Sequence, residues 1–121
     1  MARSTEVSAH VPLTPRVLLI LWALADGPQH GYCLISRAEE LGRGQVSIGP
    51  ASLYESLNTL RRRGLIENAK APADADRDDK RRRYFRLTQR GRAVLKAEAS
   101  RLAWLTTDMR TAGLIDAGNR S

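Results

Sequence analysis

Cysteine and histidine are scarce in this chain of 121 residues. Cys33 is the one cysteine, so the chain cannot close an internal disulfide, and this predicts a cytoplasmic protein in a reducing compartment. His10 and His30 are the two histidines, and so few ligands do not predict a dedicated zinc or thiolate site. The composition therefore favours neither a disulfide-stabilised fold nor a metal cofactor.

The recurrent catalytic constellations are also missing. The sequence contains no Ser-His-Asp set, no metal-ligand cluster and no phosphate-binding glycine loop. His10 falls in a polar segment without periodicity, and four aspartates gather in a polar stretch at residues 72–80. Neither place would hold a general base in a fixed position. We therefore expect a protein that is not an enzyme and that needs no cofactor.

The chain has no apolar run long enough to cross a membrane. Its longest run, residues 17–25, follows Arg16 and contains the Ala23-x-Ala25 pattern of a secretory signal peptide. That interpretation is an alternative, but the run starts late and follows a Thr-Pro helix-start signal. Cleavage after Ala25 would also remove what the pattern predicts to be a core helix.

Positive charge is present in excess, and its position is informative. The net charge is +7, and the segment 61–92 alone holds twelve Lys/Arg against five Asp/Glu. The whole excess therefore lies within that one segment. A localised basic patch is typical of nucleic-acid binding, because each neutralised phosphate releases a counterion. A solvated basic surface without a ligand is the alternative.

The predicted elements follow the order of a winged helix-turn-helix, mainly α-helical with a small β-hairpin. Periodicity and capping signals predict helices that begin at Pro15, near Gly31, at Pro50 and after Thr88. Strands are expected at 46–48, 65–69 and 82–87, with a mobile loop at 72–80. The predicted organisation is a flexible arm (1–12), a DNA-binding domain (13–88), a C-terminal dimerisation helix (89–112) and a tail (113–121).

Two helices carry more apolar surface than one small domain can cover. The helix at 15–25 is apolar almost all round, and the helix at 89–112 repeats an apolar residue every seven positions. This pattern predicts a seam for a partner helix, and packing within the same domain is the alternative. The expected ligand or dimer interface comprises Leu18, Trp22, Leu95, Leu102, Trp104, Leu105 and Met109.

Four short motifs occur together in this chain. They are HGY at residues 30–32, GPASLY at 49–54, LRRRGLI at 60–66 and RRRYFRLTQRG at 81–91. With these motifs the chain resembles PadR-family transcriptional regulators over roughly residues 15–105. The resemblance implies a winged helix-turn-helix and a short C-terminal dimerisation part, as in the compact subgroup. It also implies a homodimer that represses promoters, and some members release DNA on binding a small molecule.

Two positions depart from the family pattern. Members often carry Gly-Thr where this chain has Ala51-Ser52, so the hydroxyl is kept, and Pro where it has Glu55. Glu55 would place an acid near the expected DNA face, where it could accept from a cytosine amino group or repel a phosphate. The operator sequence of other members therefore does not transfer to this chain.

The residues expected to contact double-stranded DNA lie on two elements. The exposed face of the helix that begins at Pro50 would enter the major groove, where Asn58 suits a contact to adenine. The following loop and strand would carry cations to the backbone or minor groove. The expected set is Ser52, Tyr54, Glu55, Ser56, Asn58, Arg61, Arg62, Arg77, Lys80, Arg81 and Arg82. Tyr54 could instead be a core-edge residue, and His30 a turn residue or a backbone contact.

These observations predict a sequence-specific DNA-binding regulator, a repressor that occludes a promoter by binding a palindromic operator as a homodimer. The alternative is a dimer that senses a planar aromatic effector in a cavity lined by Trp22 and Trp104. Core packing of both tryptophans is the simpler interpretation of that pair. A metal-responsive winged helix is a third interpretation, against which the few His and Cys residues count. The aspartates at 72–80 could pair with nearby arginines or keep that loop off nonspecific DNA.

Overall fold

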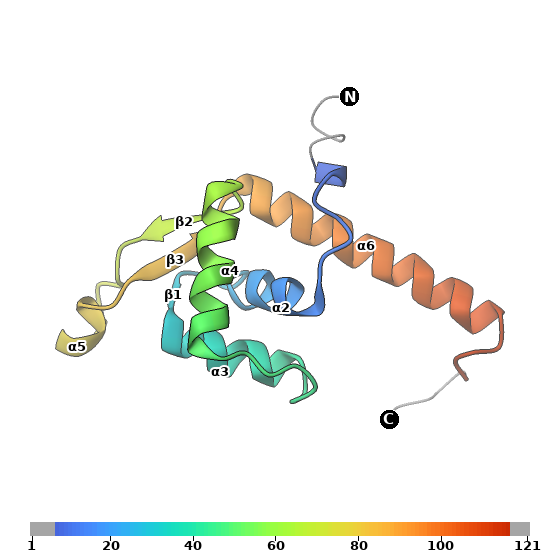
Figure 1. The fold of residues 1–121 in the computed structure, drawn as a ribbon, viewed down its shortest axis with the longest axis horizontal. Coiled ribbons are helices and arrows are strands. Elements are labelled where there is room, and N and C mark those ends of the chain that lie inside the picture. The colour runs from blue at the N-terminus through green and yellow to red at the C-terminus, as the bar shows by residue number, and fades with distance from the viewer. Residues whose placement is uncertain (1–6, 117–121) are drawn as a thin grey trace.

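The computed structural model describes residues 7–116, which form a helical domain with a small sheet at one end (Figure 1). The elements in chain order are α2 (Pro15–Ala23), β1 (Gln29–His30), α3 (Gly31–Leu41), α4 (Pro50–Arg62), β2 (Ile66–Ala69), α5 (Arg77–Lys80), β3 (Tyr84–Leu87) and α6 (Gln89–Thr111). This mainly helical architecture with a long C-terminal helix confirms the predicted fold class. Predictions for residues 1–6 and 117–121 lie outside the described residues.

α2 lies in the core and packs against both α3 and α6. The Thr14 hydroxyl accepts a hydrogen bond from the Val17 N–H at 3.3 Å, and Pro15 takes the first helical position, where its missing N–H costs nothing. The fold accounts for the apolar run, because most of its side chains are buried: Leu19, Ile20, Leu21, Ala23 and Leu24. Trp22 is the exception and remains 47% exposed.

α3 and α4 form the helix-turn-helix. α4 begins at Pro50 and buries the three leucines that helical spacing predicts to face the core: Leu53, Leu57 and Leu60. The helix ends before Gly64, whose φ of +76° is in the left-handed region that favours glycine. The Leu65 N–H then donates to the Leu60 carbonyl at 3.0 Å, which satisfies a carbonyl at the helix end.

The sheet has one more strand than the predicted hairpin. β2 and β3 form that hairpin, and β1 pairs antiparallel with the other edge of β3, with His30 opposite Tyr84. The short strand predicted at 46–48 is wrong: those residues form an irregular connection, in which the Ile48 N–H donates to the Glu39 carboxylate at 3.1 Å. Residues 46–48 have no strand partner in the described sheet of β1, β3 and β2, and a side chain satisfies the Ile48 N–H instead of a neighbouring strand.

The segment between β2 and β3 contains a turn of helix. α5 begins after Asp76, whose carboxylate accepts a hydrogen bond from the Asp79 N–H at 2.8 Å. The return strand therefore begins at Tyr84, two residues later than predicted. We refer to β2, β3 and the segment between them (residues 66–87) as the wing.

α6 leaves the sheet and runs away from the rest of the domain (Figure 1). The Thr88 hydroxyl caps it by accepting from the Gly91 N–H at 3.0 Å. Gly91 lies so close to the Leu65 carbonyl that a Cβ would overlap the oxygen, so this contact fixes how α6 leaves the wing. Farther along, large apolar side chains are exposed: Leu102, Trp104 and Met109. No helix within residues 7–116 combines the length and hydrophobicity that a bilayer span requires.

The segment that precedes α2 contacts α6. The Leu13 N–H donates to Glu98 Oε2 at 2.8 Å, and Arg101 Nε donates to Glu98 Oε1 at 2.6 Å. These bonds satisfy a carboxylate that is only 1% exposed, and the Arg101 hydrogen bond keeps the pKa of Glu98 below its usual range despite burial. Val7 and Val11 pack against the core nearby, so the described part of the predicted arm touches the domain.

Candidate nucleic-acid interface

The surface of α4 divides into stripes because an α-helix has 3.6 residues per turn. The buried leucines form one stripe, and two polar stripes flank it. We call one the wing flank (Tyr54, Asn58 and Arg61) and the other the α2 flank (Ser52, Ser56, Thr59 and the capping residue Arg63). Glu55 and Arg62 lie between the flanks, are exposed and face away from the core. The polar surface therefore covers every side of α4 except the core stripe.

On the wing flank, Tyr54 packs against the first turn of α3 and still reaches solvent. A Cβ at Gly31 would overlap the Tyr54 hydroxyl, so glycine in the HGY motif makes room for this ring. Tyr54 is 44% exposed, so it combines the core-edge role with an accessible outer edge. Next to it, Arg61 Nη2 donates to Asn58 Oδ1 at 3.5 Å, and both side chains are exposed.

Arg82 ties the wing to the start of α3. Its Nε donates to Asp79 Oδ1 at 3.1 Å, and its guanidinium carbon lies 5.0 Å from the centre of the Tyr32 ring. Tyr32 follows Gly31, which contacts Tyr54 of α4. The chain of contacts from Tyr54 to Arg82 therefore makes the wing flank of α4 continuous with the wing. The sequence had placed Asp79 among the acids that could pair with the loop arginines, but it gave no sign of Tyr32, which has no local pattern that pairs it with Arg82.

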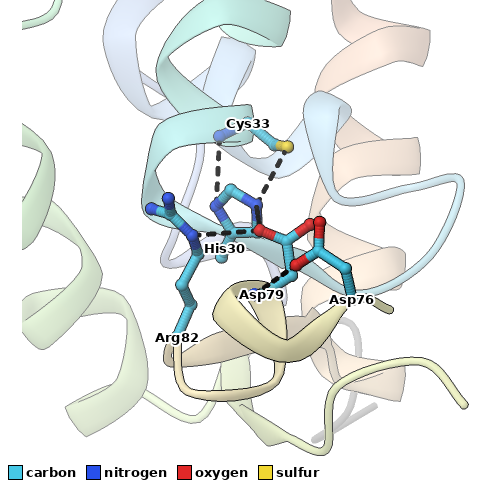
Figure 2. A network of polar contacts seen from close by, with 5 residues as sticks. All are labelled: His30, Cys33, Asp76, Asp79 and Arg82. Atoms are coloured by element: carbon cyan, nitrogen blue, oxygen red, sulfur yellow. Dashed lines mark hydrogen bonds and ion pairs between the residues drawn. The ribbon is translucent and has the colours of Figure 1, made fainter. Parts of the chain in front are cut away.

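His30 is a buried residue that links the start of α3 to the wing, through contacts with Cys33 and Asp79 (Figure 2). Its Nδ1 accepts from the Cys33 N–H at 3.5 Å, and its Nε2 lies 3.3 Å from Cys33 Sγ and 3.8 Å from Asp79 Oδ1. The residue is only 7% exposed, and its ring meets the Tyr84 ring edge-on at 5.3 Å. Burial raises the pKa of the Tyr84 phenol, and the negative charge of Asp79 raises it further. His30 is thus a buried capping residue, not an exposed contact.

The predicted pairing of loop acids with arginines applies to one of the wing cations. Asp79 pairs with Arg82, whereas Asp76 caps α5. The other three predicted cations, Arg77, Lys80 and Arg81, are exposed and form no ion pair with any residue between 7 and 116. They therefore remain available to an external anion.

A groove of about 500 Å³ lies between α2 and α6, away from the wing. Its lining is mostly apolar and includes Trp22 and Lys96. Four of the residues predicted for a ligand or dimer interface line it: Leu18, Trp22, Leu95 and Leu102. Trp104, Leu105 and Met109 lie farther along α6 and do not line it. Trp104 is 55% exposed, so the alternative in which both tryptophans are core residues does not describe this chain.

No group of three or more His, Cys, Asp or Glu side chains that could hold a metal ion occurs within residues 7–116.

The helix pair α3–α4 followed by the wing defines a winged helix-turn-helix protein. The model of the PadR-like family of transcriptional regulators matches residues 20–97. The chain belongs to this family, whose members are transcriptional regulators and not enzymes. The resemblance noted in the sequence is thereby confirmed.

Solved structures share the fold at low sequence identity. A PadR-family regulator of Clostridium difficile has a TM-score of 0.65 and 18% identity, covering 81% of this chain and 97% of its own. A PadR-like regulator of Bacillus cereus has a TM-score of 0.65 and 21% identity, covering 83% and 92%. Bacillus subtilis PadR in complex with operator DNA has a TM-score of 0.57 and 22% identity, covering 71% and 46%.

A relative with higher identity is longer than this chain. A 37.1 kDa protein in transposon TN4556 of Streptomyces fradiae is 36% identical over 89 residues. The match covers 74% of this chain and 23% of that protein, so the chain spans about a quarter of this relative.

Proposed function

We propose that this chain is a repressor that binds a roughly palindromic operator as a homodimer, with half-sites about one DNA turn apart. The observation that carries the proposal is the continuous polar surface from α4 to the wing. It joins the exposed polar side chains of α4, through the exposed rings of Tyr54 and Tyr32, to the cations of the wing. That Bacillus subtilis PadR, which shares the fold, was solved with operator DNA supports the assignment.

In this proposal α4 enters the major groove. Glu55 and Arg62 face the base edges, because they point most directly away from the core. Glu55 suits a cytosine amino group, and Asn58 suits an adenine edge. Tyr54 and Arg61 on the wing flank suit phosphates, as do the half-buried Ser52 and Ser56 on the other flank.

The wing supplies backbone contacts. Arg77, Lys80 and Arg81 have no competing partner among the described residues, so they can neutralise phosphates without breaking an ion pair. Arg82 is held by Asp79 and Tyr32, so it positions the wing and offers only its outer edge to DNA. The acids thus orient the wing in the absence of DNA.

The exposed apolar side chains of α2 and α6 support the homodimer. Trp22, Leu102 and Met109 are each more than a third exposed, and a second copy would bury them. Two domains held by α6 would present two α4 helices to successive major grooves. A dimer bound across a promoter represses most simply by occluding it, and this proposal places the protein in the cytoplasm.

Selection of bound sequences from a randomised duplex pool tests the proposal. We expect an enriched inverted repeat with centres about 10 base pairs apart, bound by two chains as measured by analytical ultracentrifugation. Arg81→Ala should weaken binding to selected and scrambled duplexes alike, whereas Asn58→Ala should weaken mainly the selected one. Enrichment of no sequence, or binding of one chain per site, would contradict the proposal.

The apolar groove favours a second candidate function, the sensing of a flat hydrophobic effector that modulates DNA binding. Its volume of about 500 Å³ is in the range of small-molecule sites, and Trp22 is one of its lining residues. Effector sensing predicts saturable quenching of tryptophan fluorescence. The quenching should persist in Trp104→Phe and disappear in Trp22→Phe. Absence of saturable quenching by a panel of planar aromatic compounds would reject it.

A further inference from the structure

A small hollow lies between the first turn of α2 and the α2 flank of α4. Its volume is about 170 Å³, and its polar lining residues are Arg16, Ser52, Glu55, Ser56, Thr59 and Arg63. Arg16 comes from α2, whereas the others come from α4 and its cap. The hollow therefore lies on the opposite side of α4 from Tyr54 and the wing.

The side chains at the hollow have the chemistry of an anion site. The lining residues carry two guanidinium groups, three hydroxyls and one carboxylate, which gives a formal net charge of +1. Arg16, Arg63 and Glu55 are exposed, and none of their side chains forms an ion pair or hydrogen bond with another residue in the range 7–116. The two arginines are therefore not committed to holding the fold together. Arginine and hydroxyl donors are the groups that recur on DNA phosphate oxygens.

The shape of the DNA major groove explains why a cation site on the α2 flank of α4 would be useful. The major groove is about 12 Å wide and is bounded on both sides by phosphates, one strand on each side. A helix lying in it needs cations on both flanks to contact both strands, and the wing supplies them on one side only. We propose that the hollow formed by Arg16 and Arg63 binds a backbone phosphate of the strand opposite the one that the wing contacts. This inference rests on the proposed DNA binding through α4.

Glu55 tunes this contact. Its carboxylate lies at the same hollow, so it opposes a phosphate there and weakens binding to any sequence. At a site with a cytosine in reach, the same carboxylate gains a hydrogen bond instead. One acid at this position therefore lowers nonspecific affinity more than specific affinity.

The salt dependence of binding to a scrambled 30-base-pair duplex tests the inference. Arg16→Ala/Arg63→Ala should reduce the slope of log K against log salt by about 0.9 for each phosphate that the protein no longer neutralises, or about 1.8 for a dimer. Arg110→Ala, which removes an exposed arginine at the far end of α6, is the matched control and should leave the slope unchanged. Equal melting temperatures of all variants would exclude a folding effect.

Glu55→Gln provides an independent readout. It should tighten binding to the scrambled duplex roughly threefold to tenfold in the wild-type background, and should have no such effect in the Arg16→Ala/Arg63→Ala background. An unchanged slope in the double variant, while Arg81→Ala flattens it, would overturn this inference and leave the proposed function standing. Failure of the wild-type protein to bind any duplex would instead remove the proposed function.

Discussion

Replacement of Gly91 by alanine separates helix propensity from packing. In an exposed helix interior this change stabilises a protein by about 1 kcal/mol, because glycine loses more backbone entropy on folding. At Gly91 the added Cβ would overlap the Leu65 carbonyl and crowd the Leu87 side chain. The Leu65 carbonyl also accepts from the Thr88 N–H at 3.1 Å, so it cannot move away without breaking the junction between the wing and α6.

The expected magnitude follows from these opposing effects. Overpacking that forces a backbone shift costs about 1–3 kcal/mol or more, and the gain in propensity offsets only part of it. We expect Gly91→Ala to lower the free energy of unfolding by about 2 kcal/mol, and the urea midpoint by on the order of 1 M. Circular dichroism of both proteins at the same concentration measures this shift and keeps any contribution from self-association comparable.

Gly49→Ala is the control for the Gly91 experiment. Gly49 has a φ of −79° and no heavy atom within 4 Å of an added Cβ, so its replacement should change stability by less than about 1 kcal/mol. A Gly91→Ala protein as stable as the wild type, or more stable, would refute the close contact between α6 and Leu65. Because that contact sets the direction of α6, it would also remove the basis for the proposed dimer geometry.

Three further changes probe the buried carboxylate and the two tyrosines. Glu98→Gln should destabilise the fold by about 1–3 kcal/mol at pH 7. Because the pKa of Glu98 is lowered by Arg101, the wild type has this stability above the ordinary pKa of glutamate and loses it as the pH falls through the folded-state value. Urea unfolding at pH 7 and pH 3 should therefore show a difference that shrinks in acid, and a constant difference would contradict the ion pair. Tyr32→Ala removes the ring under Arg82 and should weaken DNA binding a few-fold at an unchanged urea midpoint; equal affinity in anisotropy titrations would show that this contact does not position the wing. Tyr54→Phe should keep stability within about 0.5 kcal/mol, since Tyr54 is half-exposed and its hydroxyl has no hydrogen-bond partner among the described residues. A larger loss by thermal melting would show that it has one.

Local signals in the sequence were sufficient for α2, α3, α4 and α6, whereas the short helix α5 lies in a segment that was predicted to be a loop. Thr14 with Pro15, and Thr88 before the last helix, cap the elements that they predict. The leucine spacing in α4 identifies its buried side because helix periodicity is a property of neighbouring residues. The same applies to the basic segment, whose charge is visible without knowing any tertiary contact.

The parts that the sequence could not predict depend on contacts between distant segments. β1 is a strand of two residues, and it exists because His30 meets Tyr84 more than fifty positions away. The position of Arg82 over the Tyr32 ring is of this kind, because the two residues lie far apart in the sequence. In the same way, Arg16 and Arg63 line one hollow only because α2 and α4 are neighbours in space.

The central claim is that the surface from α4 to the wing binds specific DNA. The most direct test is fluorescence anisotropy of the full chain with the DNA upstream of its own coding sequence, against a scrambled duplex of equal length, over a range of salt concentrations. We predict tighter binding of the upstream DNA at every salt concentration, at two chains per duplex, with a steep salt slope for both duplexes. Equal affinity for both duplexes with no dependence on salt would contradict the claim.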